Sequence, residues 1–321
     1  MSFIRTISKD IEPGDLGWCQ CHEHIFIAEG ASKSINPALH IEDDSKSLAE
    51  VKLYKQAGGK SLVDAQPYGY GRMAEKLVWV SRETGVNIIA STGFHKTEFF
   101  SDPVWLGSQT EETLAEFYIE EIENGISASN GSRLGQKAGI IKCAAVKGEH
   151  KADSIYAKLF IAAAHASAET GAPVMIHMDQ GADAMSLAAF FGEHGVNPKQ
   201  LIFCHLDRTK YDRGYHEEVA ALGAYLEYDT VHRLKYHSDR EEAELIAHMV
   251  GHGYADRLLL SMDTTNQRLK SYGADFGLDF ILTDFRFTLE EYMPARVIEQ
   301  IMINNPAKAL SFRKSLMQSL I

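Results

Sequence analysis

The segment Gly17–Trp18–Cys19–Gln20–Cys21–His22–Glu23–His24 joins a short apolar run to two histidines that are two residues apart. Seven further apolar runs follow, and the stretches between them have helix-like patterns. Strands that alternate with helices indicate parallel pairing through βαβ crossovers, and eight such units predict a (β/α)8 TIM barrel. The predicted strands are Gly17–Cys21, Ser61–Ala65, Val86–Ser91, Gly139–Ala145, Pro173–Ile176, Leu201–Cys204, Ala224–Tyr228 and Arg257–Ser261.

Capping residues mark several helix ends. Ser47 and Glu50 have the spacing of a capping box, Thr110 precedes two glutamates, and Asp153 or Ser154 could cap a further helix. An open doubly wound sheet is the alternative fold. It would carry a glycine-rich phosphate turn after the first strand, but no GxGxxG follows Cys21.

The composition bounds the class of protein. The 321 residues include 32 basic and 44 acidic ones, which gives a net charge of −12. We therefore expect neither nucleic acid nor membrane as a partner. The first ten residues lack the apolar core of a signal peptide, and the four cysteines form no CxxC pair. These features predict a cytoplasmic protein in which residues 1–321 form a single barrel domain.

Five of the predicted strands end in, or carry, side chains that could hold a metal. In (β/α)8 barrels the active groups lie at the C-terminal ends of the strands. Residues two apart in a strand point to the same face, so both imidazoles of the first strand can reach one cation. A single histidine is more often a surface or core residue, so the joint placement carries this prediction. The candidate ligands are His22, His24, Lys142, His177, His205 and Asp263.

Strand alternation predicts where the cysteines point. On the first strand Gln20 shares a face with His22 and His24, and Cys19 and Cys21 share the other face. The other two cysteines each adjoin a candidate ligand and alternate with it. All four are therefore expected to face away from the metals and to pack against the outer helices.

Lys142 needs a separate explanation, because a protonated ammonium has no lone pair to offer a metal. Its flanks, 139–141 and 143–145, have the composition of a buried strand, in which an unpaired charge is costly. Carbamylation by CO2 would convert the amine into an anion with two oxygens. That group could bridge two cations.

These motifs together resemble the phosphotriesterase-like branch of the amidohydrolase superfamily, and within it the phosphorylated-sugar (phosphofuranose) lactonase type. The resemblance implies a (β/α)8 barrel with two divalent ions, usually zinc. It also implies that members often form homodimers. The matching stretches are Cys21–His24, Gly139–Lys142, Pro173–His177, Cys204–Asp207 and Leu259–Asp263.

The resemblance also implies a role for each ligand. His22, His24 and Asp263 would hold the more buried ion, and His177 and His205 the more exposed one. Carboxylated Lys142 and a hydroxide would bridge the two ions. The hydroxide would attack the substrate, and Asp263 would accept its proton as the catalytic residue.

Cationic loops suggest an anionic substrate. Seven basic residues follow three neighbouring predicted strands: Arg208, Lys210, Arg213, Arg233, Lys235, Arg268 and Lys270. Arginine and lysine in such loops favour recognition of a phosphate. We expect Lys235 and Arg268 to bind that phosphate, with Arg233 and His95 also lining the substrate site.

Polar residues favour a small sugar over a long acyl chain. In the family that the sequence resembles, many lactonases of the hydrophobic type carry a tyrosine in place of His95. Tyr228, Tyr236 and Asp179 could contact sugar hydroxyls. The predicted reaction is therefore the opening of a phosphorylated sugar lactone, of the aldono-1,4-lactone 5-phosphate type, by a metal hydroxide.

Three alternatives stay open. The first is a phosphotriesterase, or another ester or lactone hydrolase with a less polar substrate. The second is a metal-dependent amidase or peptidase. The third is a non-catalytic barrel protein, because a fold alone does not establish activity.

Overall fold

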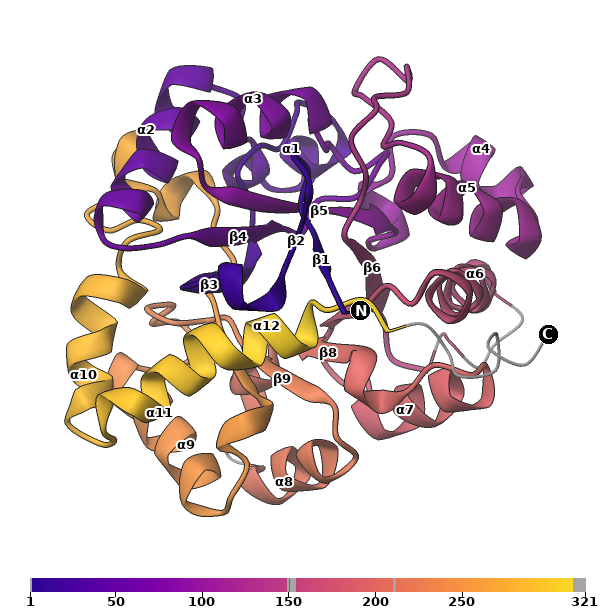
Figure 1. Ribbon diagram of the computed structural model, residues 1–321. Helices are drawn as coiled ribbons and strands as arrows, with labels where there is room; N and C mark the ends of the chain where they lie inside the picture. Colours follow the sequence, from indigo (N-terminus) through magenta and orange to yellow (C-terminus); the bar gives the residue numbers. More distant parts are fainter. Residues whose placement is uncertain (1, 149, 151–153, 210–211, 314–321) are drawn as a thin grey trace.

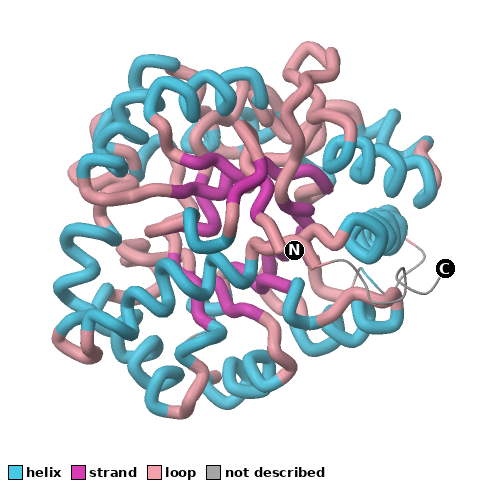
Figure 2. The backbone as a smooth tube through the Cα atoms, viewed as in Figure 1, coloured by secondary structure: helices cyan, strands magenta, loops and turns pink. Residues whose placement is uncertain are grey.

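The computed structural model describes residues 2–148, 150, 154–209 and 212–313. Within them, eight parallel strands pair in sequence order and helices surround them (Figures 1 and 2). The first and last strands also meet, because the Asp263 amide donates to the His22 carbonyl at 3.1 Å. The predicted (β/α)8 TIM barrel is confirmed. Its strands are β3 (Cys19–Glu23), β4 (Ser61–Asp64), β5 (Asn87–Gly93), β6 (Ile140–Ala145), β7 (Val174–Met178), β8 (Leu201–Cys204), β9 (Tyr225–Tyr228) and β10 (Leu258–Leu260).

Helices form the outer layer, visible as the ring around the central strands in Figure 2. No helix in the described part of the chain has the length and apolar character needed to cross a bilayer. The α-helices are α1 (Ala31–Ile35), α2 (Asp44–Gln56), α3 (Ala74–Thr84), α4 (Pro103–Ser108), α5 (Glu111–Glu123), α6 (Ile155–Thr170), α7 (Ala184–Glu193), α8 (Arg213–Ala221), α9 (Asp239–Gly251), α10 (Arg286–Glu290), α11 (Ala295–Glu299) and α12 (Asn305–Ala309).

The predicted ends of the strands and helices differ in places from the observed ends. Each predicted strand overlaps an observed one, with ends that differ by at most two residues. Thr110 and Ser154 cap α5 and α6 as predicted, whereas Asp153 lies outside the described residues. The capping box at Ser47 is wrong. Asp43 caps α2 instead, and the Ser47 hydroxyl lies within the helix and donates to the Ile25 carbonyl.

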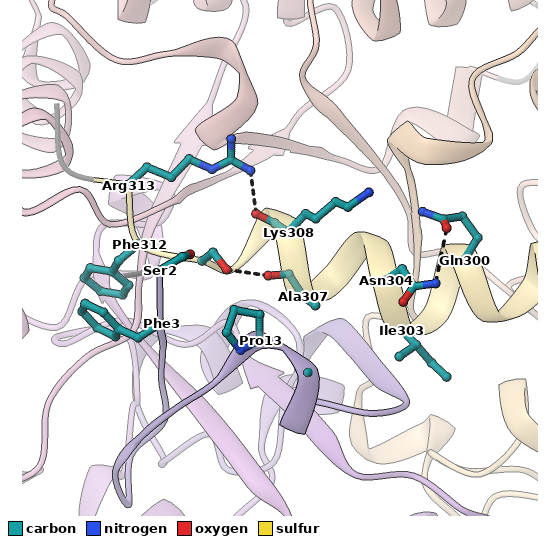
Figure 3. Close-up of a pocket in the computed structure, with 12 residues that line it drawn as sticks. Ser2, Phe3, Pro13, Gln300, Ile303, Asn304, Ala307, Lys308, Phe312 and Arg313 are labelled. Atoms are coloured by element: carbon teal, nitrogen blue, oxygen red, sulfur yellow. Dashed lines mark hydrogen bonds between the residues drawn. The ribbon is translucent and has the colours of Figure 1, made fainter. Parts of the chain in front are cut away.

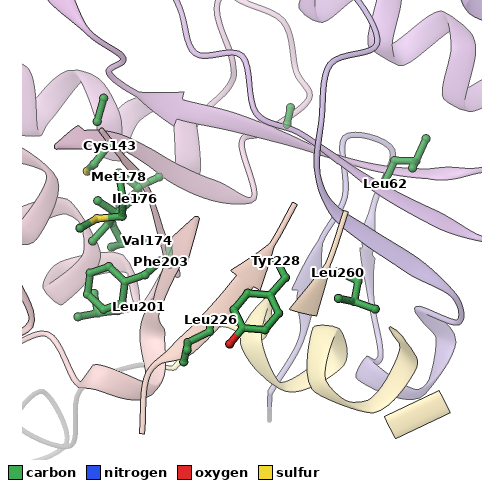
Figure 4. Close-up of a cluster of buried hydrophobic side chains, with 14 of the residues drawn as sticks. Leu62, Cys143, Val174, Ile176, Met178, Leu201, Phe203, Leu226, Tyr228 and Leu260 are labelled. Atoms are coloured by element: carbon green, nitrogen blue, oxygen red, sulfur yellow. The ribbon is translucent and has the colours of Figure 1, made fainter. Parts of the chain in front are cut away.

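Two layers of apolar side chains hold the barrel together. Side chains that point outward from the strands pack against the helices, as Figure 4 shows for Leu62, Ile176, Phe203 and Leu226. A smaller cluster fills the barrel interior. The helices are therefore fixed to the sheet by burial of apolar surface, which positions the loops that follow each strand.

The cysteines do not lie where alternation places them. Cys19, Cys21 and Cys204 belong to the interior cluster, and only Cys143 belongs to the outer layer. All four are free and buried. The expectation that all four pack against the outer helices is therefore wrong for three of them.

A register shift in β3 explains part of this difference. Pairing between β3 and β4 is irregular between Gln20 and Glu23, so simple alternation fails there. Gln20 points outward and donates to the Leu278 carbonyl at 2.7 Å, whereas Cys21 lies in the interior. The irregularity allows His22 to turn inward next to Cys21, although the two are adjacent in sequence.

The first and last described segments of the chain lie together at the N-terminal end of the barrel. An antiparallel pair, β1 (Ile4–Arg5) and β2 (Asp10–Ile11), lies there beside α12 (Figure 1). Phe3 and Phe312 stack with their ring centroids 4.8 Å apart, and a cavity of about 960 Å³ opens beside them (Figure 3). None of the predicted ligands lines this cavity, so size alone does not locate the functional site.

Candidate metal centre and its cavity

Side chains from β3 and from the loop after β10 converge at the C-terminal end of the barrel. Asp263 Oδ1 lies 3.4 Å from His24 Nε2 and 3.8 Å from His22 Nε2. The three residues offer ligand atoms that all lie within 4.8 Å of one another. These three residues form the first of two neighbouring groups of candidate ligands. Their ligand atoms are close enough together to bind one ion.

The second group comes from β7 and β8. His177 Nδ1 and His205 Nε2 are 2.6 Å apart, and the two rings are nearly perpendicular, at 80°. The His205 ring also lies 4.9 Å from the His22 ring, which joins the two groups. Lys142 Nζ lies 3.0 Å from His22 Nε2. The structure thus brings all six predicted ligands into one cluster.

Two of these residues have unusual backbone conformations. His205 has a φ of 64° and Asp263 a φ of 48°, in the left-handed region that non-glycine residues rarely adopt. In each case the chain has just left its strand, so the left-handed residue turns its side chain over the end of the barrel. Such strain is concentrated at functional sites in proteins.

Asp229 belongs to this cluster, although no sequence motif indicated it. Its carboxylate lies 2.8 Å from His22 Nδ1 and 2.5 Å from His205 Nδ1. Because a carboxylate accepts, both imidazoles donate from Nδ1, which leaves Nε2 as the nitrogen with a lone pair that faces the cluster. Burial opposes ionisation of Asp229, but His205 and His22 outweigh it and hold its pKa below the usual range. The signal was available, since Asp229 directly follows the predicted strand Ala224–Tyr228.

Burial disfavours the charged form of three of these imidazoles, and a metal requires the neutral form. Burial, together with the nearby Lys142, lowers the pKa of His22 to about 3. Burial also lowers the pKa values of His177 and His205. Two ring nitrogens, His24 Nδ1 and His177 Nε2, are buried and have no hydrogen-bond partner among the described residues. Imidazoles with one carboxylate are a donor set that suits zinc, so the residues fit divalent ions of that class.

Lys142 is fully buried, and its amine has unusual neighbours. Besides His22, Nζ lies 3.4 Å from Met175 Sδ. Within the described residues no carboxylate lies within 4.0 Å of it. The side chain therefore has no acidic partner among the described residues, and its carbamylation stays a prediction.

A cavity of about 280 Å³ opens over the cluster. Arg208 and Arg233 both donate to Asp263 Oδ2, at 3.2 and 3.0 Å. Burial opposes ionisation of Asp263, but Arg233 and the histidines outweigh it and hold its pKa well below the usual range. The residues that line the cavity include His24, Gln66, Tyr70, His95, Lys96, His177, Asp179, Arg208, Arg233, Lys235, Tyr236 and Asp263.

The predicted substrate contacts divide into two groups. Lys235, Arg233 and His95 line the cavity as expected, together with Tyr236 and Asp179. His95 accepts a hydrogen bond at Nδ1 from the Lys96 amide, and burial lowers its pKa.

Arg268 does not line the cavity. Its guanidinium donates to the backbone carbonyls of Val231, His232 and Met262, and burial lowers its pKa to about 10. Sequence patterns could not separate this structural role from ligand binding, because both place an arginine after a strand. Arg268 instead supports the loop that carries Arg233.

Other predicted loop residues also lie away from the cavity. Lys270 pairs with Asp279 at 2.7 Å. The Tyr228 hydroxyl is fully buried and bonds to His216 Nδ1, so it does not reach a substrate. Arg213 begins α8, and Lys210 lies outside the described residues.

The sequence of this chain is similar to those of several known proteins. A sequence model of the phosphotriesterase family matches residues 2–310. A phospho-furanose lactonase of Mycoplasmopsis synoviae (strain 53) is 30% identical over 97% of this chain and 92% of its own length. An N-acetyltaurine hydrolase of Mus musculus is 30% identical over 97% of this chain and 98% of its own length.

A solved structure has a similar fold. The structure of an amidohydrolase from Mycoplasma synoviae has a TM-score of 0.91 and 30% identity, and the match covers 98% of this chain and 93% of that one.

Proposed function

Because this chain belongs to the phosphotriesterase family, we propose that it is a binuclear metal-dependent hydrolase that opens a phosphorylated sugar lactone, of the aldono-1,4-lactone 5-phosphate type. One observation carries the proposal. A cavity lined by several cations lies directly over the cluster of candidate ligands, in a chain whose net charge is −12. The relative named phospho-furanose lactonase supports the same substrate class.

The metal ligands are proposed residue by residue. His22, His24 and Asp263 would hold one ion, His177 and His205 the other, and carboxylated Lys142 would lie between them. When bound, two divalent ions, zinc in this proposal, lower the pKa of a water molecule and polarise a carbonyl oxygen.

Asp263 is the proposed proton carrier. Its Oδ1 faces the histidines, whereas Oδ2 faces Arg208 and Arg233 at the cavity. It would accept the proton of the attacking water and return it to the ring oxygen that leaves the lactone carbonyl. The two arginines favour its ionised form, which is the form that can accept a proton.

The phosphate would bind at the cationic wall of the cavity. Lys235 and Arg233 come from one loop and Arg208 from the preceding one. Arginine can hold two phosphate oxygens at once, and lysine adds a point charge. Arg268 has no part in this revised site, because it does not line the cavity and its Nη1 and Nη2 donate to three backbone carbonyls.

An anionic amide is the second candidate substrate. The N-acetyltaurine hydrolase relative is as similar to this chain as the lactonase relative, at 30% identity for each. The name of that relative describes an amide that carries an acidic group, and the cationic wall would suit such a group equally well.

The remaining proposals concern the protein as a whole. We propose that residues 1–321 act as one domain, in the cytoplasm and as a homodimer. The four free, buried cysteines are in keeping with a reducing compartment. Light scattering during size-exclusion chromatography would measure the oligomeric state, and a monomer would contradict the proposed dimer.

A substrate panel tests the function. Zinc-loaded protein is mixed with pentono-1,4-lactone 5-phosphates, the same lactones without phosphate, N-acetyltaurine, and a neutral phosphate triester. We expect acid release from the phosphorylated lactones with the highest kcat/KM. Faster turnover of the amide or of the triester would overturn the proposed substrate.

The Lys235→Ala variant tests the phosphate site. Loss of one charged hydrogen bond, worth about 1.5–3 kcal/mol, predicts a fall of about 10- to 100-fold in kcat/KM for the phosphorylated lactone. The lactone without phosphate should be unaffected. Lys52→Ala, a change of an exposed lysine on α2, is the matched control. An equal loss on both lactones would show that Lys235 does not bind the phosphate.

A further inference from the structure

A second cluster of metal-binding side chains lies on the outer surface, between α8 and α9. Glu217 lies on α8, and His248 and His252 lie at the C-terminal end of α9; the two helices are neighbours in the outer ring (Figure 1). Their ligand atoms lie within 4.8 Å of one another. His252 precedes β10, whereas Asp263 follows it, so this cluster lies at the opposite end of the barrel from the candidate metal centre.

A hydrogen bond and a ring contact already bring the three side chains together. His248 Nε2 lies 2.7 Å from Glu217 Oε1, and the His248 and His252 ring centroids are 4.0 Å apart. His252 Nδ1 lies 2.8 Å from the His248 carbonyl. A carbonyl only accepts, so this ring donates from Nδ1 and keeps the lone pair on Nε2. The same bond fixes the orientation of many metal-ligating histidines.

The helix geometry and the local charge favour a cation. Residues four apart lie on the same face of a helix, a spacing that allows two histidines to hold one zinc ion. The carbonyl end of α9 carries partial negative charge, and Glu217 adds a carboxylate. All three side chains are partly accessible: Glu217 is 31% and His248 18% exposed, and His252 is exposed.

We propose that Glu217, His248 and His252 bind one divalent ion of the zinc class, with water as a further ligand, and that this ion ties α8 to α9. Bonds of about 2 Å in tetrahedral geometry place two ligand atoms about 3.3 Å apart. The hydrogen bond between Glu217 and His248 would therefore open by roughly half an ångström when the ion replaces its proton. The site is independent of the proposed hydrolysis, because none of these residues lines the cavity.

The test measures the number of zinc ions bound per protein chain. Holoenzyme with its catalytic zinc in place is equilibrated with buffered free Zn2+ in the micromolar range, and bound zinc is measured by mass spectrometry. We expect one more equivalent per chain in the wild type than in His252→Ala. Each of His252→Ala and Glu217→Gln should weaken this additional binding about tenfold or more, or 1.4 kcal/mol.

A matched control and a stability readout complete the test. His194, at the end of α7, makes the same Nδ1 bond, to the Phe190 carbonyl at 2.8 Å, but belongs to no such cluster among the described residues. His194→Ala should keep the additional equivalent. Added zinc should raise the Tm of the wild-type holoenzyme, but not that of His252→Ala. Equal zinc content in the wild type and His252→Ala, or an equal loss in His194→Ala, would overturn the proposal.

Discussion

At the scale of single residues, Asp229 contacts two of the candidate ligands, although no sequence motif marks it. One fully buried carboxylate holds the Nδ1 atoms of both His22 and His205. The two histidines belong to different proposed metal sites, so one side chain orients ligands of both. A carboxylate that binds a metal-ligating histidine typically changes metal affinity 10- to 100-fold.

We therefore expect Asp229→Asn to weaken zinc binding about 10- to 100-fold. An asparagine amide can accept at only one oxygen, so one of the two imidazoles loses its partner. Competition with a chromophoric chelator measures the affinity. Asp183→Asn, which changes the exposed cap of α7, is the control. Unchanged zinc affinity in Asp229→Asn would contradict the proposed orienting role.

Asp263→Asn tests the proton transfer. Asparagine keeps an oxygen that can ligate a metal but cannot accept the proton, so kcat should fall about 100- to 10,000-fold. Bound zinc is measured on the same sample, in order to separate lost chemistry from lost metal. Turnover equal to that of the wild type, with zinc retained, would remove Asp263 from the mechanism.

At the scale of elements, the ends of the strands aim the ligands. The irregular pairing of β3 turns His22 inward, and left-handed residues after β8 and β10 turn His205 and Asp263 over the barrel. Gly93 has a related role at the end of β5. A Cβ there would lie 2.1 Å from the Lys142 carbonyl oxygen, so only glycine lets β5 approach β6 at this point.

A buried ion pair joins the loop after β4 to α5. Arg72, in the loop after β4, donates to both Glu121 carboxylate oxygens on α5, at 2.8 and 2.6 Å. Both side chains are 0% exposed. Arg72→Met leaves the carboxylate buried and unpaired, and we expect a loss of about 3–5 kcal/mol in the free energy of unfolding. Arg133→Met removes the exposed partner of Glu120 and should cost about 1 kcal/mol or less. Equal losses in the two variants would contradict the expected effect of burial.

The same pair predicts a pH dependence. Burial opposes ionisation of Glu121, but Arg72 outweighs it and holds the pKa below its usual value of 4.5. The folded pKa is lower than the unfolded one, so the pair stabilises the protein above pH 4.5 and this stabilisation is lost as the pH falls through the folded pKa. Urea unfolding between pH 6 and pH 3 should show a steeper loss below pH 4.5 for the wild type than for Glu121→Gln. Parallel curves would contradict this assignment.

At the scale of the whole molecule, the proposed ligands connect distant parts of the chain. They come from β3, β6, β7 and from the residues after β8 and β10. An ion that binds only the folded barrel stabilises it by mass action, by about 2.7 kcal/mol at a free concentration of 100 Kd.

Removal of the metal should therefore lower the Tm by several degrees. Dialysis against a chelator, followed by return of zinc, is checked by calorimetry together with metal counting. The double change His22→Ala and His24→Ala should lose this zinc response. A Tm that does not depend on zinc in the wild type would contradict the proposed metal centre.

The sequence by itself determined the order of the elements and the candidate ligands. Strand and helix patterns are local, so eight apolar runs were enough to predict the barrel. The position of each ligand at a strand end is also a local property. Because the C-terminal ends of parallel strands share one side of a barrel, the pattern predicted that these side chains would meet.

Only the tertiary structure decided which way individual side chains point and what they contact. The irregular pairing in β3 and the left-handed backbone at His205 break the simple alternation, so the cysteine placement failed. Arg268 and Lys235 are both basic residues after strands, yet one binds carbonyls and the other faces the cavity. Such differences depend on contacts between segments far apart in the chain, and no local pattern records them.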